Sequence, residues 1–406
     1  MKIVDVTGAE GMQRRVKRAA LQVLLLVVLV PAGIVAGWYA VSPSAGELAA
    51  RAAQGADSIA LLELVQRAER DSVSAEALTR LVGEDAAVMH ELASLSTGHE
   101  EALDYLISVA RYQPETLALI SDLEMSYAFA LAILQRMDAA GIPTLEQYAA
   151  IHSNAAFVLG VAYENGCHVP QDWELAARWY GLAHDAGYAP AGAYYAPAAY
   201  EAGLASHTME SAAYWFAEAA EYGHAAAQCA LGVCYAETGD LINAVSWYTK
   251  AAEQGMSDAQ YNLGWCYLYG EGVEADATES VRWFYLAAEQ GDDLAQYYVG
   301  RAYELGEGVS QDYAEAVRWY CWAVEQGNAA AQCALGHCYA QGRGVEQDWS
   351  RAVYFYQLSA EQERTEAMLA LSHCYEQGLG VAQDAAWAQH WRQRAAKILQ
   401  QQPNPS

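Results

Sequence analysis

The chain of 406 residues is strongly acidic: 50 Asp and Glu stand against 22 Lys and Arg, and the formal net charge is −28. Such an excess of carboxylates repels phosphate backbones and excludes nucleic-acid binding as an expected function. An apolar content of 54% excludes a disordered polar chain, and abundant alanine with few β-branched residues favours helices. The acidic surface would suit a basic partner, although excess carboxylate also serves solubility alone.

A long uncharged segment lies near the N-terminus, between Ala19 and Gly46. About 20 apolar residues suffice to cross a bilayer as a helix, so we predict a transmembrane signal-anchor helix at residues 19–41. The basic segment 1–18 precedes it, and Glu47 is the first charge after it. The positive-inside rule then predicts a cytoplasmic N-terminus, one crossing of the inner membrane and a periplasmic body.

The alternative to an anchor is a cleaved secretory signal. The apolar run is long for such a signal, and Pro43 spoils the small-x-small cleavage pattern around residues 42–45, so we favour an uncleaved anchor. In a eukaryote the far side of the membrane would be the lumen of the endoplasmic reticulum. The chain has no usable glycosylation sequon, since Asn404 is followed by Pro405, and this favours the periplasm.

Residues 47–150 are predicted to be a helical region, possibly of degenerate repeats. A Gly-Ile-Pro-Thr sequence at residues 141–144 marks the passage into a clearer pattern. The amphipathic stretches expected as helices are Ser58–Glu69, Ala75–Val82, Glu100–Arg111 and Glu124–Ala139.

Internal repeats fill residues 151–400. The sequence Ala-Gln-x-x-x-Gly recurs three times at intervals of 36 residues, ending at the glycines 264, 300 and 336. We call the last residue of this sequence the anchor. The anchor positions are Gly160, Pro197, Gly232, Gly264, Gly300, Gly336 and Ser372.

Each repeat reads as two helices. A tyrosine three residues after the anchor shares its helical face and should fill the space beside it: Tyr163, Tyr200, Tyr235, Tyr267, Tyr303, Tyr339 and Tyr375. A Gly-x-Gly-Val turn follows, where glycine adopts positive φ at no steric cost. An aspartate then stands where an N-cap opens the second helix, at Asp172, Asp312, Asp348 and Asp384.

This pattern resembles the Sel-one-like repeat family, a relative of the tetratricopeptide repeat with a longer turn between its helices. The resemblance covers seven units over residues 151–400. It implies an all-α right-handed superhelical solenoid that acts as a protein-interaction scaffold or adaptor and not as an enzyme. Two departures are clear: unit 227–258 lacks the four-residue turn insert, and Pro197 should make unit 191–226 irregular.

Eight cysteines invite a chemical interpretation. Four of them lie two residues after an anchor and are expected in the core, where a thiol behaves as a small hydrophobe: Cys234, Cys266, Cys338 and Cys374. Cys229 and Cys333 lie three before an anchor, on the face expected to be concave. Cys321 could also reach Cys333 from the preceding second helix.

A soft-metal site from Cys333, His337 and His373 is conceivable, because Cys333 and His337 are four residues apart and His373 repeats the position of His337. No carboxylate or second thiolate completes it, so we predict no metal, cofactor or catalytic group. The alternative function is a metal- or thiol-redox-responsive binding module built on these side chains.

The predicted function is to bind a protein or peptide partner on the concave face of the repeats. The positions expected to line it vary between units, while the packing positions do not. They are Tyr261, Trp265, Tyr269, Tyr297, Arg301, Glu304, His337, Gln341, His373 and Glu376. Residues 401–406 are predicted to be a disordered tail, and no sequence feature indicates an oligomeric state.

Overall fold

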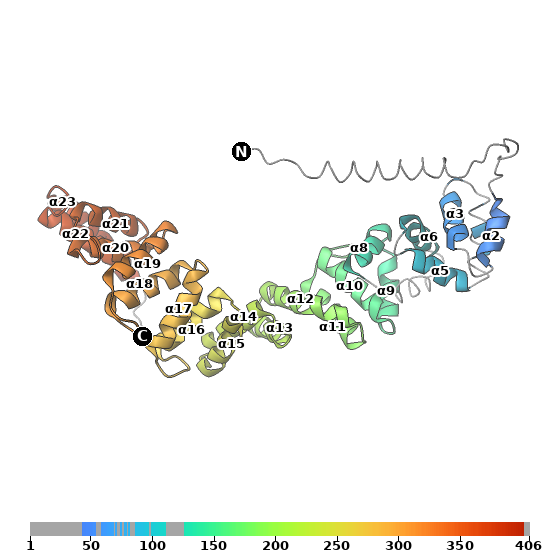
Figure 1. Ribbon diagram of the computed structural model, residues 1–406, viewed down its shortest axis with the longest axis horizontal. Helices are drawn as coiled ribbons and strands as arrows, with labels where there is room; N and C mark the ends of the chain where they lie inside the picture. Colours follow the sequence, from blue (N-terminus) through green and yellow to red (C-terminus); the bar gives the residue numbers. More distant parts are fainter. Residues whose placement is uncertain are drawn as a thin grey trace, which may run out of the picture. The chain divides into compact units, whose positions relative to one another are not determined.

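The computed structural model describes residues 43–53, 58–68, 70, 74, 77–78, 80–81, 86–96, 99–110 and 126–401. All regular elements in these ranges are helices, so the predicted all-α class is confirmed for them (Figure 1). None of the helices in the described ranges is long and apolar enough to span a bilayer. The predicted transmembrane helix at residues 19–41 lies outside these ranges. The last helix includes Gln401, and the rest of the predicted tail also lies outside.

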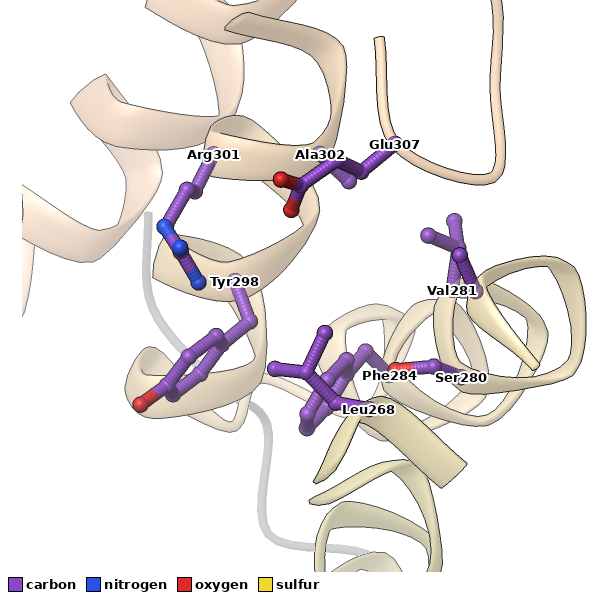
Figure 2. A pocket seen from close by; sticks show the side chains of 9 residues that line it. Leu268, Ser280, Val281, Phe284, Tyr298, Arg301, Ala302 and Glu307 are labelled. Atoms are coloured by element: carbon purple, nitrogen blue, oxygen red, sulfur yellow. The ribbon is translucent and has the colours of Figure 1, made fainter. Parts of the chain in front are cut away.

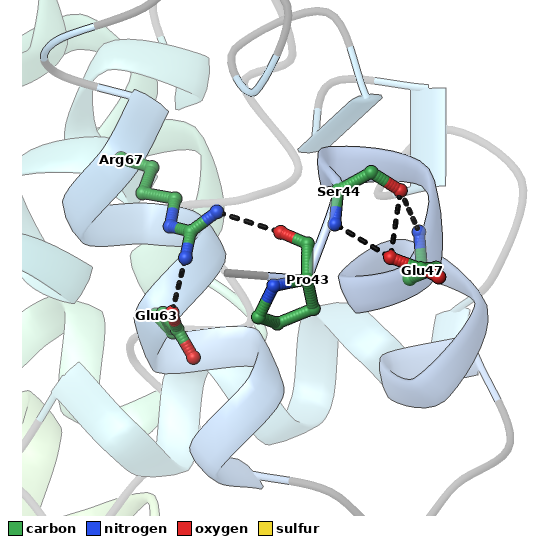
Figure 3. Close-up of polar contacts among 5 residues, drawn as sticks. All are labelled: Pro43, Ser44, Glu47, Glu63 and Arg67. Atoms are coloured by element: carbon green, nitrogen blue, oxygen red, sulfur yellow. Dashed lines mark hydrogen bonds and ion pairs between the residues drawn. The ribbon is translucent and has the colours of Figure 1, made fainter. Parts of the chain in front are cut away.

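The chain divides into two compact units, Met1–Ala102 and Leu103–Ser406. In the first, α2 (Ala45–Ala53) packs on α3 (Ser58–Ala68), and α3 also contacts α5 (Ala86–Ser96). Ser44 and Glu47 form a capping box at the start of α2, each side chain bonding the backbone N–H of the other (Figure 3). This bond to the Ser44 N–H lowers the pKa of Glu47.

Arg67 on α3 holds the chain that leads into α2. Its guanidinium donates to the carbonyl oxygen of Pro43, 2.8 Å away, and pairs with Glu63 one turn earlier on the same helix (Figure 3). The start of the first unit is therefore tied by polar contacts as well as by the buried leucines of both helices.

Three helices precede the repeats along the chain: α6 (Glu100–Ala110), which begins in the first unit, α8 (Tyr127–Arg136) and α9 (Gly141–Ala149). The helices α3, α6 and α8 fall within three of the four stretches expected to be helical. Residues 141–144, which mark the passage into the clearer repeats, form the first turn of α9. Pro143 is tolerated there because the first turn of a helix needs no backbone N–H donors.

Fourteen helices then follow as seven pairs, each a first helix and a second helix. Consecutive helices pack on one another throughout, which is the stacking that the repeats require (Figure 1). Their bounds are α10 Ser153–Asn165 and α11 Trp173–Asp185; α12 Gly192–Ala205 and α13 Met209–Glu221; α14 Ala225–Glu237 and α15 Leu241–Glu253; α16 Ser257–Tyr269 and α17 Ala277–Glu289; α18 Asp293–Leu305 and α19 Tyr313–Glu325; α20 Ala329–Gln341 and α21 Trp349–Glu361; α22 Thr365–Gln377 and α23 Ala385–Gln401.

Each anchor glycine packs against an aromatic ring of the second helix and not, as the sequence suggested, against the tyrosine three residues after it. A Cβ on Gly300 would lie 2.7 Å from Cδ1 of Tyr320, which belongs to the second helix of the same pair. The tyrosine three residues after the anchor lies beside the turn instead: the carbonyl of Tyr303 accepts the backbone N–H of Asp312. Spacing along one helix could not reveal a partner on the next one. The anchors and their rings pair as Gly160 with Tyr180, Gly232 with Tyr248, Gly264 with Phe284, and Gly336 with Tyr356.

The turn glycines join neighbouring units. Gly306 and Gly308 have φ of 73° and 74°, in the left-handed region. A Cβ on Gly308 would lie 2.1 Å from the carbonyl oxygen of Ala277, at the start of the preceding second helix. Glycine is therefore required there for close backbone approach as well as for its dihedral angles. All four aspartates predicted as N-caps accept backbone N–H bonds at the start of the second helices.

A buried glutamine links successive units. Gln296 on α18 donates to the carbonyl of Ala288 on α17, and its own carbonyl accepts from Gln326 at the end of α19. Both contacts recur: Gln228 bonds Ala220 and Gln254, and Gln260 bonds Ala252 and Gln290. Each of these amides therefore ties the second helix of one unit to both helices of the next.

The unit at 191–226 is irregular, as Pro197 suggested. A short 3₁₀ turn, η1 (Ala189–Ala191), leads into α12, which contains Pro197 inside the helix. The ring of the second helix, Phe216, lies against Gly203, six residues after the anchor position Pro197. The proline has no backbone N–H to donate, and the close approach between the two helices has moved along α12.

Candidate functional site

The positions proposed for binding lie on one side of the first helices. The anchor residue of each first helix faces the second helix of its own pair. The residues three before the anchor, one after it, and four or five after it share a different side of the same first helix. We call this side of α16, α18, α20 and α22 the first-helix face. It carries all ten residues predicted to bind a partner.

A pocket of about 340 Å³ opens on the first-helix face between α18, α20 and the start of α22. It brings together five of the ten predicted residues, and Cys333 with them. The pocket residues used below are Tyr297, Arg301 and Glu304 from α18, Tyr320 from α19, Cys333, His337 and Gln341 from α20, and Arg364 and Glu366 at the start of α22.

Both carboxylates of this pocket already have partners. Glu304 accepts a hydrogen bond of 2.6 Å from the hydroxyl of Tyr320, and Arg343 lies 3.6 Å from its other oxygen. Glu366 pairs with Arg364 at 2.8 Å. The predicted binding residue Glu304 is thus held by the repeat itself.

Arg301 has no such partner. Its side chain is half-buried and forms no hydrogen bond, ion pair or cation–π contact within the described part of the chain. Its other side borders a cavity of about 10 Å³, room for no more than a water molecule, lined by Tyr298, Phe284 and Glu307 among others (Figure 2). Glu307 makes no ion pair with Arg301, so the guanidinium is left for a group in the larger pocket.

His337 and Cys333 contact each other on α20. Sγ of Cys333 lies 3.7 Å from Nε2 of His337, and the hydroxyl of Tyr356 lies 2.8 Å from Nδ1. Burial raises the pKa of the Cys333 thiol to about 11 and lowers the pKa of His337, so both groups are neutral at physiological pH. Cys333 is buried, and the thiol forms part of the pocket floor.

The third proposed metal ligand does not join them. His373 is exposed on the next first helix, and in the described residues no three His, Cys, Asp or Glu side chains form a group able to hold a metal ion. Equivalent positions on stacked helices are about 8–10 Å apart, whereas metal–ligand bonds are about 2 Å, so the repeat period alone cannot build this site.

All eight cysteines are free thiols. Cys321 packs against the core cluster that contains Cys338, whereas Cys333 belongs to the following cluster, so the structure does not bring out the proposed contact between Cys321 and Cys333. Of the four thiols expected in the core, Cys266, Cys338 and Cys374 are buried, and Cys234 is partly exposed.

The remaining aromatic residues form a cluster beside the pocket. We call Tyr261, Trp265, Tyr269 and Tyr298 the aromatic cluster. Ring centroids of Trp265 lie 4.5 Å from Tyr269 and 5.6 Å from Tyr298, and Tyr261 lies 6.1 Å from Tyr298. Tyr269 is 52% exposed, so the cluster is anchored in the core at one end and open to solvent at the other.

His373 and Glu376 lie beyond the pocket. Glu376 pairs with Arg392 at 3.1 Å and borders a second pocket of about 500 Å³ between α22 and α23. The structure therefore separates the ten predicted residues into a pocket, an aromatic cluster and a C-terminal pair. Only the first two adjoin, through Tyr297, Tyr298 and Arg301 of α18.

The sequence reasoning missed Arg364 and Glu366. Arg364 occupies the N-cap position of α22, where the two preceding first helices have Asp292 and Asn328. Those two residues accept a backbone N–H bond from their own helix, and Arg364 does not. An arginine at a position where the two preceding units have a helix-capping side chain could have drawn attention to Arg364 from the sequence alone.

The paired, stacked helices define an all-α solenoid of helical repeats. The model of the Sel1 repeat matches residues 153–188, 225–256, 257–292, 293–328, 329–363 and 365–397, together half of the chain. The chain therefore belongs to the Sel1 repeat family. Six of the seven predicted units are matched, and the one left out contains Pro197.

One solved structure agrees with this assignment, and a second is reported for comparison. A protective antigen of uropathogenic Escherichia coli strains, with an SLR fold, is 31% identical, with a TM-score of 0.51; the match covers 63% of this chain and 56% of that one. The chain thus spans little more than half the length of that relative. A Sel1 repeat protein from Oxalobacter formigenes is 29% identical with a TM-score of 0.47, covering 78% and 88% of the two chains. No curated protein matches the sequence significantly.

Sel1 repeat proteins generally act as protein–protein interaction scaffolds and are typically not enzymes. Both carboxylates of the pocket serve packing and charge pairing within the repeats.

Proposed function

We propose that this chain is a membrane-tethered interaction scaffold whose first-helix face binds a protein or peptide segment on the extracytoplasmic side of the inner membrane. The observation that carries the binding half of this proposal is the open pocket of about 340 Å³ beside the aromatic cluster. Both are built from positions whose residues change from unit to unit, while the anchor glycines and their rings recur.

The chemistry of these positions suits protein recognition. Tryptophan, tyrosine and arginine dominate the energetics of protein interfaces, because each combines a large apolar surface with a directional polar group. Trp265, Tyr269 and Arg301 supply all three types within two neighbouring first helices. A peptide segment lying across them would bury the exposed edge of Tyr269 and fill the pocket.

Selection from a random peptide display library tests the binding surface. The full-length chain in detergent is expected to enrich peptides that the variant Trp265→Ala/Tyr269→Ala no longer retains. The matched control is Trp322→Ala/Tyr354→Ala, which removes exposed aromatic side chains of α19 and α21 and should retain the same peptides. Equal loss in both variants, with thermal melting unchanged, would contradict a site on the first helices.

The tether rests on the uncharged segment 19–41 and the basic residues before it. Alkaline phosphatase, which is active only outside the cytoplasm, can be fused after Ser406. We expect activity in a membrane fraction that resists carbonate extraction, and none when residues 1–41 are deleted. Activity released into the soluble periplasmic fraction would indicate a cleaved signal, and inactivity of the full-length fusion would refute export.

A further inference from the structure

Arg301 stands apart from the other arginines of the second unit. Between residues 126 and 401 there are ten arginines, and nine of them lie within 4.0 Å of a carboxylate oxygen. Arg301 is the exception in that range. In a chain with 50 acidic residues, one half-buried guanidinium without a carboxylate is notable, because an uncompensated cation away from water costs free energy.

The two carboxylates that line the larger pocket with Arg301 pair with other groups, and Glu307, which lines the small cavity with it, makes no ion pair with it. Glu304, one turn further along α18, is held by Tyr320 and Arg343, and Glu366 is held by Arg364. His337 is neutral and bonds Tyr356. The pocket therefore contains a guanidinium that neither of its carboxylates pairs with.

The surroundings of Arg301 would strengthen a charge pair. Tyr297 and Tyr298 flank it on the same helix, and burial raises the pKa of both phenols, which marks a site partly removed from water. A guanidinium offers five N–H donors in a planar fork that fits a carboxylate with two parallel hydrogen bonds. Such a pair is worth more here than on an open surface.

From this geometry we infer that the pocket binds a side-chain carboxylate of the partner, with Arg301 as the recognising residue. The inference rests on the proposed function, since it specifies what the peptide segment must carry. The first-helix face continues on both sides of the pocket, toward the aromatic cluster and toward α22. A segment can thus pass over it, and the chain need not end there. The preferred ligand is an Asp or Glu near an aromatic or aliphatic residue.

The charge of the chain makes this inference easy to test. With a net charge of −28, general electrostatics would select basic peptides, so an acidic preference has to come from a specific site. The random library is selected on the full-length wild type, on Arg301→Gln, and on Arg318→Gln. Arg318 is an exposed arginine of the same unit that already pairs with Glu315, so its variant is the matched control.

We expect the wild type and Arg318→Gln to enrich peptides with an Asp or Glu at one position, and Arg301→Gln to lose that preference. For one selected peptide, Arg301→Gln and an Asp→Asn change in the peptide should each weaken binding about tenfold or more. The two changes together should weaken it no further than either alone, because they remove the same contact.

The outcomes separate this inference from the proposed function. Enrichment of basic or uncharged peptides, or an acidic preference that survives Arg301→Gln, overturns the carboxylate site and leaves the binding surface in place. Binding only to peptides with a free C-terminus, lost on amidation, overturns the assignment to a side chain. Failure of the wild type to enrich any peptide overturns both proposals.

Discussion

The hydroxyl of Tyr320 on α19 donates a hydrogen bond of 2.6 Å to the carboxylate of Glu304 on α18. The same ring closes over Gly300, so one side chain both packs the helix pair and restrains an acid at the edge of the pocket. Tyr180 and Glu164 repeat this contact four units earlier. The packing of the repeat therefore also sets the charge that a ligand would meet.

Replacing Tyr320 by Phe keeps the ring and removes only this hydrogen bond. We expect the free energy of unfolding to fall by about 1 to 2 kcal/mol, since the acceptor is charged and mostly covered. Glu304 would then be free to pair with Arg301 one turn away, and binding of acidic peptides should weaken. Urea unfolding and peptide titration measure the two effects. Tyr354→Phe, at an exposed site, should change neither, and unchanged peptide binding in Tyr320→Phe would refute the link.

Adding one methyl group at an anchor should loosen a helix pair. In Gly300→Ala the new Cβ would meet the Tyr320 ring at 2.7 Å. Overpacking of this kind costs about 1 to 3 kcal/mol, against a gain of about 1 kcal/mol in helix propensity. We expect a net loss of stability in urea unfolding.

The double variant Gly300→Ala/Tyr320→Leu should lose less than the sum of the single changes, because the smaller side chain makes room. Glu325→Ala, at an exposed site of the same unit, serves as the neutral control. Additive losses would show that the ring is not what the glycine accommodates.

The glutamine links predict cooperativity between units. Gln296→Ala would leave the carbonyl of Ala288 and the amide of Gln326 without their present partner, at a cost of about 1 to 3 kcal/mol. Hydrogen exchange should quicken at the end of α17 and the start of α18, where the two units meet. Gln341→Ala, on the exposed first-helix face, should leave exchange unchanged. Equal protection in both variants would show that the amide contributes little.

Alkaline pH should destabilise the fold. Burial raises the pKa of Cys266, Cys333 and Cys374 to about 11, above the 9.0 of an exposed thiol. Between these values the unfolded chain releases protons that the folded chain retains, so the free energy of unfolding falls as pH rises above about 9. Urea midpoints at pH 8 and pH 10 measure this decline. It should be shallower in Cys266→Ala/Cys374→Ala, and a midpoint independent of pH would contradict buried, protonated thiols.

Much of the fold could be predicted because the same packing residues recur at the same positions in several units. Pro197 predicted the irregular unit, and Asp312 and its equivalents predicted where the second helices begin. Both predictions succeed because a proline in a helix and an N-cap act on the backbone within a few residues. The site was predicted less completely. Tyr297, Arg301 and His337 were placed on one face by periodicity, but the same argument added His373, which lies beyond the pocket.

What the sequence alone determined is the architecture: the period, the two helices per unit, and the side of each first helix that faces away from its own pair. These follow from spacing within a helix and from the need of each unit to bury its apolar side against the next. Only the tertiary structure decided that Gly300 faces Tyr320, that Arg343 and Tyr320 pair with Glu304, and that Arg301 forms no ion pair in the described part of the chain. Those facts depend on contacts between different helices, and hydrogen bonds and ion pairs are settled by distances of a few ångströms that no period along the chain encodes.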